Sequence, residues 1–299
     1  MRGSLAIHEG VVYVGAEERT AHVRAYDLDG APLEAGFKFR GAKDGAAAVD
    51  GLAVDNDHRI WVADGVGGRV LGFSLVGTPL VEVPGQQSGS HDGAGVLGRP
   101  VGVQSLGEDD EQVLIVASGG QRRHGLHVLP CVAERRALSL RPLGEQDGKF
   151  HDLRGLALGV DNGDVLVCEA GRARLQVFRN WDYHRAIEVQ PGRAVFEPNA
   201  LAVCEDGRLV IAQGGERSGL LLCGPDGRLL RVLAQGGEGE GRVQDPGDVV
   251  LEAGQDDRHT RILVIDRDGL RMQVFNLAGD CWGTFPGRGA WLADPPGGS

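Results

Sequence analysis

The sequence predicts an all-β protein, a six-bladed β-propeller of four-stranded antiparallel blades. A weak repeat of six copies runs along the 299 residues, and its equivalent positions lie 45 to 53 residues apart. Periods of this length in a β-rich chain are typical of propeller blades. Turn pairs such as Asp-Gly and Asn-Gly recur between the short apolar segments, as hairpins require. No segment has the pattern of a helix of useful length. The equivalent positions are Leu5, Leu52, Val103, Leu156, Leu201 and Val249.

The second copy shows the four strands of one blade most clearly. Gly51–Val54 is a short apolar segment, and the turn residues Asp55–His58 follow it. Arg59–Asp64 and Arg69–Phe73 are rich in β-forming residues, and Leu80–Val83 supplies the fourth strand. The other copies repeat this order. Their second strands are predicted at Val11–Val14, Leu114–Val116, Val165–Val167, Leu209–Ile211 and Ile262–Ile265. Their third strands are predicted at Val23–Tyr26, Leu126–Leu129, Leu175–Phe178, Leu220–Cys223 and Met272–Phe275.

The six copies fill one unit, residues 1–288, and leave a tail at 289–299. We expect blades at about residues 4–45, 46–95, 96–148, 149–194, 195–240 and 241–288. Each blade is complete as read, so the N-terminus need not lend a strand to the last one. Alternatively, Gly289–Asp294 continues the circle, and the sequence leaves both arrangements open.

Composition narrows the class of protein. The net charge of −11 argues against general binding of polyanions. There is no membrane-length apolar stretch and no signal-peptide pattern, so we expect a cytoplasmic chain or a fragment of a longer one. The five cysteines are odd in number and lack a C-x-x-C pair, which disfavours a zinc module or a disulfide framework. Cys168, Cys204 and Cys223 lie in strand patterns and are expected to be buried free thiols.

Several segments resemble the NHL repeat. The closest are Gly51–Asp55, Ile60–Asp64 with Arg69-Val70, and the glycine-rich link from Gly236 to Pro246. The resemblance covers the whole chain and implies six blades and a binding function. Some members of that family are ubiquitin ligases, but this chain lacks their cysteine/histidine modules, so ligase activity is not predicted.

One ring of residues follows the second strands, and three of its members are acids. Arginines come five positions after each acid, in blades 2, 4 and 6. The same offset belongs to the NHL repeat, so we interpret these as structural pairs that hold a loop, not as a chemical site. The pairs are Asp64 with Arg69, Glu169 with Arg174 and Asp266 with Arg271.

A second ring precedes the innermost strands and contains Asp50, Arg154 and Asn199. The segments around Asp50 and Asn199 are similar to the gluconolactonase/SMP-30 propellers, in which an Asp and an Asn at such positions bind a divalent metal and handle a lactone. Here the two residues are three blades apart and the ring has no matching Glu. A metal-dependent hydrolase of lactones or other small molecules is therefore the alternative function, with Asp50 and Asn199 at the channel mouth.

Histidines offer a further enzyme reading, similar to the zinc-dependent peptidylglycine amide lyases. His91, His124 and His151 lie in links and loops near the third and fourth blades, but their spacing is not a zinc signature. Solvated loop histidines are the simpler interpretation. We expect no metal, no cofactor and no catalytic residue.

Basic residues favour a non-catalytic binding or scaffold module. They lie in the second-to-third-strand loops of blades 3, 4 and 5, which share one face, and Arg154 opens the inner ring beside them. A protein or acidic peptide is the favoured partner, since aromatic residues for stacking on single-stranded RNA make up only 5% of the chain. Replacing Arg122, Arg123 and Arg172 with Glu is expected to abolish capture of this partner. The predicted partner-binding residues are Arg122, Arg123, His124, Arg154, Arg172 and Arg217.

Overall fold

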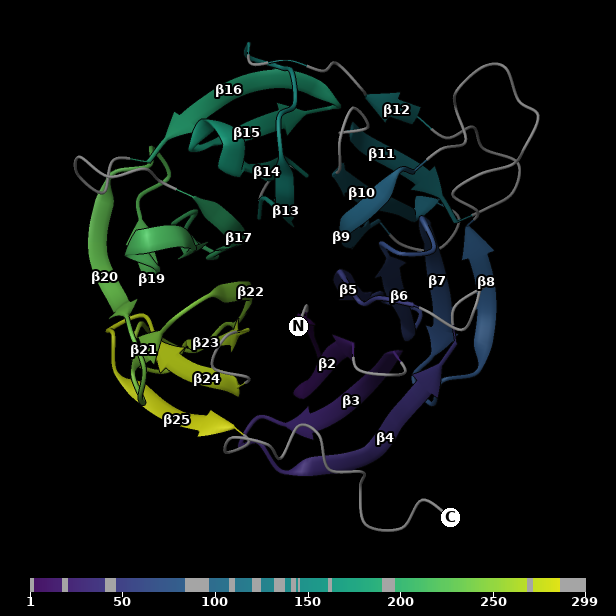
Figure 1. Cartoon of the computed structure of the whole chain (residues 1–299), viewed down its shortest axis with the longest axis horizontal. Helices are drawn as coiled ribbons and strands as arrows, with labels where there is room; N and C mark the ends of the chain where they lie inside the picture. The colour runs from purple at the N-terminus through teal and green to yellow at the C-terminus, as the bar shows by residue number, and fades with distance from the viewer. Residues whose placement is uncertain are drawn as a thin grey trace.

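The computed structural model is a six-bladed β-propeller, with the blades arranged as a ring around a central channel (Figure 1). The structure describes residues 3–17, 21–40, 47–83, 97–107, 111–119, 125–131, 138–140, 144, 146–160, 163–189, 197–267 and 271–285. No α-helix occurs within these ranges. The prediction of fold class is confirmed.

The first three blades are each a single antiparallel meander. Blade 1 contains β1 (Gly3–His8), β2 (Val11–Glu17), β3 (Ala21–Asp27) and β4 (Pro32–Phe39). Blade 2 contains β5 (Gly51–Val54), β6 (Arg59–Asp64), β7 (Arg69–Ser74) and β8 (Pro79–Val83). Blade 3 contains β9 (Arg99–Leu106), β10 (Val113–Gly119), β11 (Gly125–Pro130) and β12 (Leu138–Leu140).

The last three blades repeat the meander, with single-turn 3-10 helices in two loops. Blade 4 contains β13 (Leu153–Leu158), β14 (Val165–Glu169), η2 (Ala170–Arg172), β15 (Arg174–Arg179) and β16 (Asp182–Glu188). Blade 5 contains β17 (Pro198–Val203), β18 (Leu209–Gln213), η3 (Gly215–Arg217), β19 (Gly219–Cys223), β20 (Leu229–Gly236) and β21 (Arg242–Val243). Blade 6 contains β22 (Pro246–Glu252), β23 (Arg261–Asp266), β24 (Arg271–Asn276) and β25 (Cys281–Phe285).

Blade 5 departs from the predicted pattern because part of its glycine-rich link forms a fifth strand. The short strand β21 pairs in parallel with the end of β20. Between them the chain loops back to run in the same direction again, through Gly237, Gly239 and Gly241, whose φ angles are 140°, 97° and 75°. Only glycine adopts such angles readily, so the link forms an ordered turn that the strand pattern alone did not predict.

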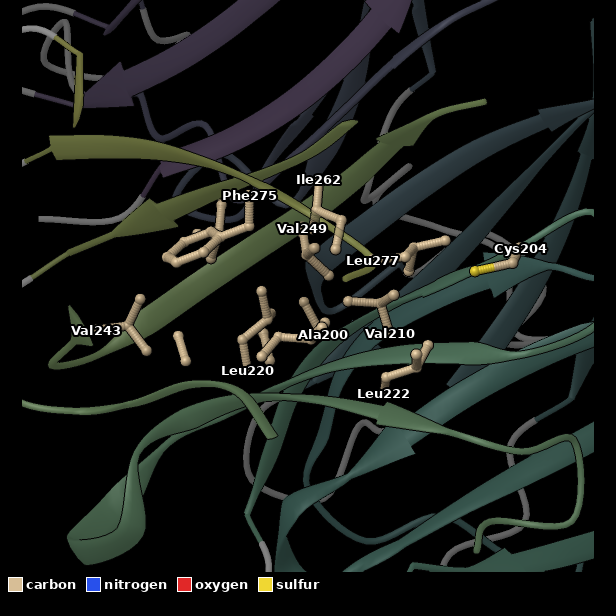
Figure 2. Packing of buried hydrophobic residues seen from close by; sticks show 14 residues of the cluster. Ala200, Cys204, Val210, Leu220, Leu222, Val243, Val249, Ile262, Phe275 and Leu277 are labelled. Atoms are coloured by element: carbon tan, nitrogen blue, oxygen red, sulfur yellow. The ribbon is translucent and has the colours of Figure 1, made fainter. Parts of the chain in front are cut away.

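The hydrophobic core is divided among the six contacts between neighbouring blades. Each contact is one cluster of apolar side chains drawn from the two facing sheets. Figure 2 shows the cluster between blades 5 and 6, where Phe275 and Ile262 of blade 6 pack toward Leu220 and Val210 of blade 5. Stability of the ring therefore rests on sheet-to-sheet packing repeated six times.

The buried cysteines belong to this core. Cys168, Cys204 and Cys223 are buried and free, as predicted. Burial raises the pKa of the Cys204 thiol to about 11 and that of Cys223 to about 12. Both remain protonated at neutral pH and pack as small apolar groups, because the thiolate is the nucleophilic form.

The ring closes where blade 6 meets blade 1. The described strands of blade 1 lie within residues 3–39 and those of blade 6 within residues 246–285, so neither blade borrows a strand from the other. Gly289–Asp294, which the sequence left as a possible continuation of the circle, lies outside the described residues. Packing of Leu5 and Val14 against Leu263 and Ile265 closes the ring.

A half-buried carboxylate adds a polar link to this closure. Asp248 of blade 6 accepts hydrogen bonds from the Ser4 hydroxyl at 2.6 Å and from the Leu5 backbone N–H at 2.8 Å, both in blade 1. Its second oxygen accepts from the Val249 N–H at 2.9 Å. Burial nevertheless raises the pKa of Asp248 above its ordinary value of 3.8, since the hydrogen bonds only partly offset desolvation.

Asp248→Asn is therefore expected to change how stability depends on pH. A carboxyl whose pKa is raised on folding contributes stability below about pH 3.8 that is lost as pH rises through the folded-state pKa. The free energy of unfolding of the wild-type protein, minus that of Asp248→Asn, should therefore decrease as pH rises above about 3.8. Urea unfolding of both proteins across the acidic range measures this difference; a constant difference would contradict it.

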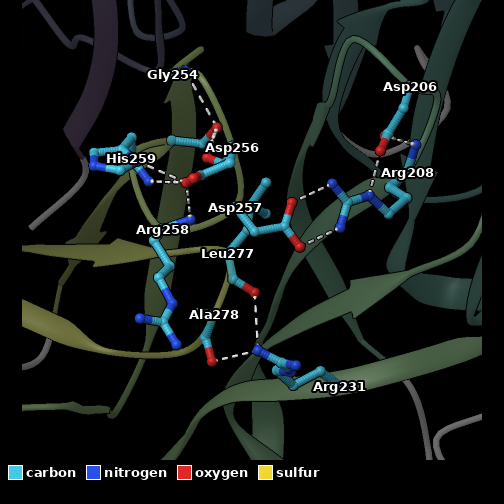
Figure 3. Close-up of polar contacts among 11 residues, drawn as sticks. Asp206, Arg208, Arg231, Gly254, Asp256, Asp257, Arg258, His259, Leu277 and Ala278 are labelled. Atoms are coloured by element: carbon cyan, nitrogen blue, oxygen red, sulfur yellow. Dashed lines mark hydrogen bonds and ion pairs between the residues drawn. The ribbon is translucent and has the colours of Figure 1, made fainter.

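Asp257 offers a matched comparison of opposite sign, in the loops where blades 5 and 6 meet (Figure 3). Its carboxylate receives two hydrogen bonds from Arg208, at 2.9 and 2.6 Å, and this lowers the pKa of Asp257. Its stabilising contribution is present above about pH 3.8 and is lost as pH falls through the lowered pKa. Asp257→Asn should thus produce the opposite slope to Asp248→Asn.

Within the described part of the chain, no helix has the length and apolar character needed to span a membrane.

Candidate functional site at the channel mouth

The two predicted rings of residues lie together on one face of the propeller. Strand pairing joins the start of each innermost strand to the end of the second strand, as in Leu153 with Glu169 and Pro246 with Asp266. We call this the mouth face, and it also carries the second-to-third-strand loops. Innermost strands end, and second strands begin, on the opposite face.

The three acid–arginine pairs form as predicted. The distances are 3.0 Å for Asp64–Arg69, 2.6 Å for Glu169–Arg174 and 3.0 Å for Asp266–Arg271. All three acids are fully buried. Such geometry is that of charge-assisted hydrogen bonds held away from water.

Each pair also fastens the link that arrives from the preceding blade. Glu169 accepts the backbone N–H of His151 at 2.7 Å, and Arg174 donates to the carbonyls of Gln146 and Lys149. In blade 2 the Asp64 carboxylate accepts from the backbone N–H of Ala48. In blade 6 the Asp266 carboxylate accepts from the backbone N–H groups of Gln244 and Asp245. The pairs are therefore components of the scaffold, in agreement with their structural interpretation.

A cavity of roughly 300 Å³ occupies the centre of the mouth face. Its walls are mainly the first residues of the innermost strands. Polar groups enter it from all six blades. They are Ser4, Asp50, Arg99, Gln104, Asp152, Arg154, Asn199, Asp248 and Arg267.

Asp50 and Asn199 both line this cavity, as the alternative enzyme reading requires, but each has a competing contact. The Asp50 carboxylate is 3% exposed and lies 3.6 Å from the Arg99 guanidinium. The Asn199 amide donates to the Pro246 carbonyl at 3.0 Å and faces Asp245 at 3.4 Å. A guanidinium beside the carboxylate opposes a divalent cation there, so these residues do not fit the metal site that the lactonase resemblance implies.

The other carboxylates around the mouth are also occupied. Asp152 pairs with Arg154 at 2.8 Å, and Asp245 pairs with Arg267 at 2.7 Å. Asp248 accepts hydrogen bonds from Ser4 and Leu5 of blade 1, as described above. Carboxylates whose oxygens already accept from a guanidinium are poorly placed to take a proton from a substrate.

The predicted partner-binding residues that the structure describes lie on adjacent blades of the mouth face. Arg154 is the second residue of β13, Arg172 ends η2 and Arg217 ends η3, and all three are exposed. Arg122, Arg123 and His124 lie outside the described residues, as does His91. Of the predicted basic surface, the structure therefore places the part that belongs to blades 4 and 5.

A groove beside Arg217 was not predicted from the sequence. It has a volume of roughly 700 Å³ and runs from η3 along β19 and β20. Glu216, Arg217 and Ser218 line one end, and Leu229 with Val232 line the other. Sequence reasoning also missed Arg99 and Arg267, because it compared one position of each ring per blade and these arginines lie one or two residues away from such a position.

Comparison with known proteins establishes the fold and nothing finer. No family model and no curated protein match the chain. A virginiamycin B lyase from Staphylococcus aureus matches at 10% identity and a TM-score of 0.60, over 95% of this chain and 84% of the other. A gluconolactonase from Xanthomonas campestris matches at 15% identity and 0.62, over 92% and 86%. A nidogen/laminin complex structure matches at 17% identity and 0.64, over 92% and 93%.

These similar structures include two enzymes and one protein complex. At such identities they support a shared six-bladed propeller, while function must be argued from the residues of this chain.

Proposed function

We propose that the protein is a non-catalytic binding or scaffold module of NHL type that holds a partner on its mouth face. The observation that carries this proposal is the set of exposed arginines on adjacent blades, Arg154, Arg172 and Arg217, the last of which lines the groove along β19 and β20. Rigid scaffolds that present charged loops on one face are well suited to recognition.

The contacts that the carboxylates make in the central cavity favour a binding function over a catalytic one. Its carboxylates are engaged with arginines or with backbone N–H groups, as in Asp152–Arg154 and Asp248–Leu5. The described cysteines nearest the acid ring are buried, and burial raises the pKa of the Cys168 thiol well above its ordinary value. Neither group offers an activated nucleophile or base.

The chemistry of the surface favours an acidic protein segment as the partner. Guanidinium groups bind carboxylates through paired hydrogen bonds, and Leu229 and Val232 in the groove offer contacts to apolar side chains. Single-stranded RNA needs aromatic stacking platforms. The exposed aromatic side chains found in the described ranges, Tyr183 and Trp282, belong to the fourth strands β16 and β25, at the outer edge of the ring.

Charge reversal at the mouth face tests this proposal. Peptides selected from a random displayed library on the wild-type protein should be rich in Asp and Glu. Arg172→Glu combined with Arg217→Glu is expected to weaken their binding at least about tenfold, because like charges then face each other. Arg154 is left intact because it already pairs with Asp152. Fluorescence anisotropy of the labelled peptides measures the change.

The matched control reverses two arginines on the opposite face. Arg228 and Arg258 are exposed in hairpins of blades 5 and 6, so Arg228→Glu with Arg258→Glu makes the same change in net charge. Binding should be retained in this variant. Equal loss in both variants, or selective binding of single-stranded oligonucleotides in place of acidic peptides, would overturn the proposed partner. Chelator-sensitive lactone hydrolysis that disappears in Asn199→Ala would overturn the non-catalytic assignment.

A further inference from the structure

Two histidines and a glutamate meet on the opposite face, between blades 1 and 2. His8 is the last residue of β1, and Glu9 follows it in the turn to β2. His58 ends the turn that joins β5 to β6. His8 is half-buried, while Glu9 and His58 are exposed. None of the contacts described for the mouth face uses these residues.

The donor atoms of the three side chains converge. His8 Nε2 and His58 Nδ1 lie 2.8 Å apart, and the two rings are nearly perpendicular, with centroids 5.0 Å apart. One ring nitrogen of each histidine and a Glu9 carboxylate oxygen all lie within 4.8 Å of one another. One imidazole donates its N–H to the ring nitrogen of the other, so the two nitrogens occupy the same small region between the turns.

The backbone holds these side chains in place through unusual dihedral angles. Glu9 and Gly10 have φ angles of 49° and 76°, so both central residues of the β1–β2 hairpin are left-handed. That combination defines the tight type I′ turn. His58 also has a positive φ, 58°, which is uncommon for a residue other than glycine. Both turns thus direct a donor side chain toward the junction of the two blades.

The turn that carries His58 is anchored in the core of blade 2. The backbone N–H of His58 donates to the Asp55 carbonyl at 3.1 Å. The buried Asp55 carboxylate accepts from the Arg59 backbone N–H at 2.9 Å and from the Trp61 indole N–H at 2.6 Å. Asp55 and Trp61 are almost fully buried, and Trp61 packs in the contact between blades 2 and 3, so the turn is held by the core of blade 2. A separate cluster that includes Leu52 and Ile60 packs blade 2 against blade 1.

We propose that His8, Glu9 and His58 form a binding site for a divalent transition-metal ion of the Zn²⁺ class. Two imidazoles and one carboxylate are a common zinc donor set, with ligand bonds of about 2.0–2.2 Å. Tetrahedral geometry then separates ligand atoms by roughly 3.4 Å, between the 2.8 Å of the histidine pair and the 4.8 Å limit of the cluster. Side-chain rotation is enough to reach it, because Glu9 and His58 are exposed. Three protein ligands leave one position for water or another small ligand.

This donor set selects the kind of ion. Imidazole nitrogens suit Zn²⁺, Co²⁺, Ni²⁺ and Cu²⁺, whereas Ca²⁺ and Mg²⁺ require oxygen ligands throughout. The bound ion would join the first hairpin of blade 1 to that of blade 2. Such a site lies on the face opposite the proposed partner surface and does not depend on it.

Zinc titration of the full chain by calorimetry tests the proposal. We expect one Zn²⁺ per chain, and at least about tenfold weaker binding in His8→Ala, in His58→Gly and in Glu9→Gln. Glycine at position 58 tolerates the left-handed φ, so loss of the ring is separated from strain in the turn. His184→Ala removes an exposed histidine of β16 and should bind zinc like the wild type.

Cobalt gives a second readout that does not depend on folding energetics. The Co²⁺ complex should show ligand-field bands without a thiolate charge-transfer band, which excludes binding at the half-buried Cys131 and Cys281. Unchanged zinc stoichiometry and affinity in His8→Ala with His58→Gly would overturn the site, as would a thiolate band. If the glycine variant fails to fold, Glu9→Gln decides, since it leaves both hairpins intact.

Discussion

Arg174→Ala is expected to lower the free energy of unfolding by about 3–5 kcal/mol, the usual cost of leaving one member of a buried ion pair without its partner. The Glu169 carboxylate is fully buried and lies 2.6 Å from Arg174 Nε. Without the guanidinium, Glu169 keeps only neutral donors, the Gln176 amide at 2.6 Å and the His151 N–H at 2.7 Å. Arg174 also donates to two carbonyls of the incoming link, which would lose those bonds. Urea denaturation monitored by tryptophan fluorescence measures the loss.

The matched control is an arginine on the same strand whose ion pair faces solvent. Arg179 ends β15, is 42% exposed and lies 2.7 Å from Asp164. Arg179→Ala should leave the unfolding midpoint nearly unchanged, because exposed ion pairs contribute little stability. Equal loss in the two alanine variants would contradict a special role for the buried pair. Glu169→Gln combined with Arg174→Met should recover part of the stability, because no buried charge remains.

The repeat predicted these pairs because the offset of five residues is a local property. An acid at the end of the second strand and an arginine at the start of the third must face each other across the hairpin, as Asp266 and Arg271 do. The number of blades and the order of strands were predictable for the same reason. Period, turn residues and strand composition all describe neighbours in the chain.

Contacts between blades were harder to predict, since they depend on the angle and register at which separate sheets meet. Arg99 reaches Asp50 from the next blade, and His8 meets His58 across 50 residues of chain. No spacing rule links such positions. The sequence held only a weak indication that these two histidines meet. His58 lies where a turn needs a left-handed residue, and Glu9 precedes a glycine in a two-residue turn.

The basic surface was predicted only in part. Alignment of the copies placed Arg172 and Arg217 in equivalent loops, and the structure describes both as exposed ends of 3-10 helices on one face. Pairing of Arg154 with Asp152, two residues earlier, was not anticipated. A local ion pair of this kind reduces the charge available to a partner, so the contribution of Arg154 should be smaller than that of Arg217.

Phe275→Ala is expected to destabilise the protein by about 3–5 kcal/mol, because truncating a buried phenylalanine removes its burial and leaves a cavity. Phe275 is fully buried on β24 and packs in the contact between blades 5 and 6 (Figure 2). Its neighbours Leu220 and Val249 belong to strands fixed by main-chain hydrogen bonds, so they cannot move in to fill the space. Thermal or urea unfolding measures the effect.

Trp282→Ala provides the comparison within the same blade. Trp282 lies on the outer strand β25, is 43% exposed and contacts the Arg261 guanidinium at 5.4 Å. Its loss should cost no more than about 1 kcal/mol, the usual size of an exposed cation–π contact. If the contacts between blades hold the propeller together, loss of the larger but exposed Trp282 side chain will lower the free energy of unfolding less than loss of the smaller, buried Phe275 side chain. Equal effects of the two substitutions would mean that the blades rearrange to close the cavity, and the ring would then be more deformable than its packing indicates.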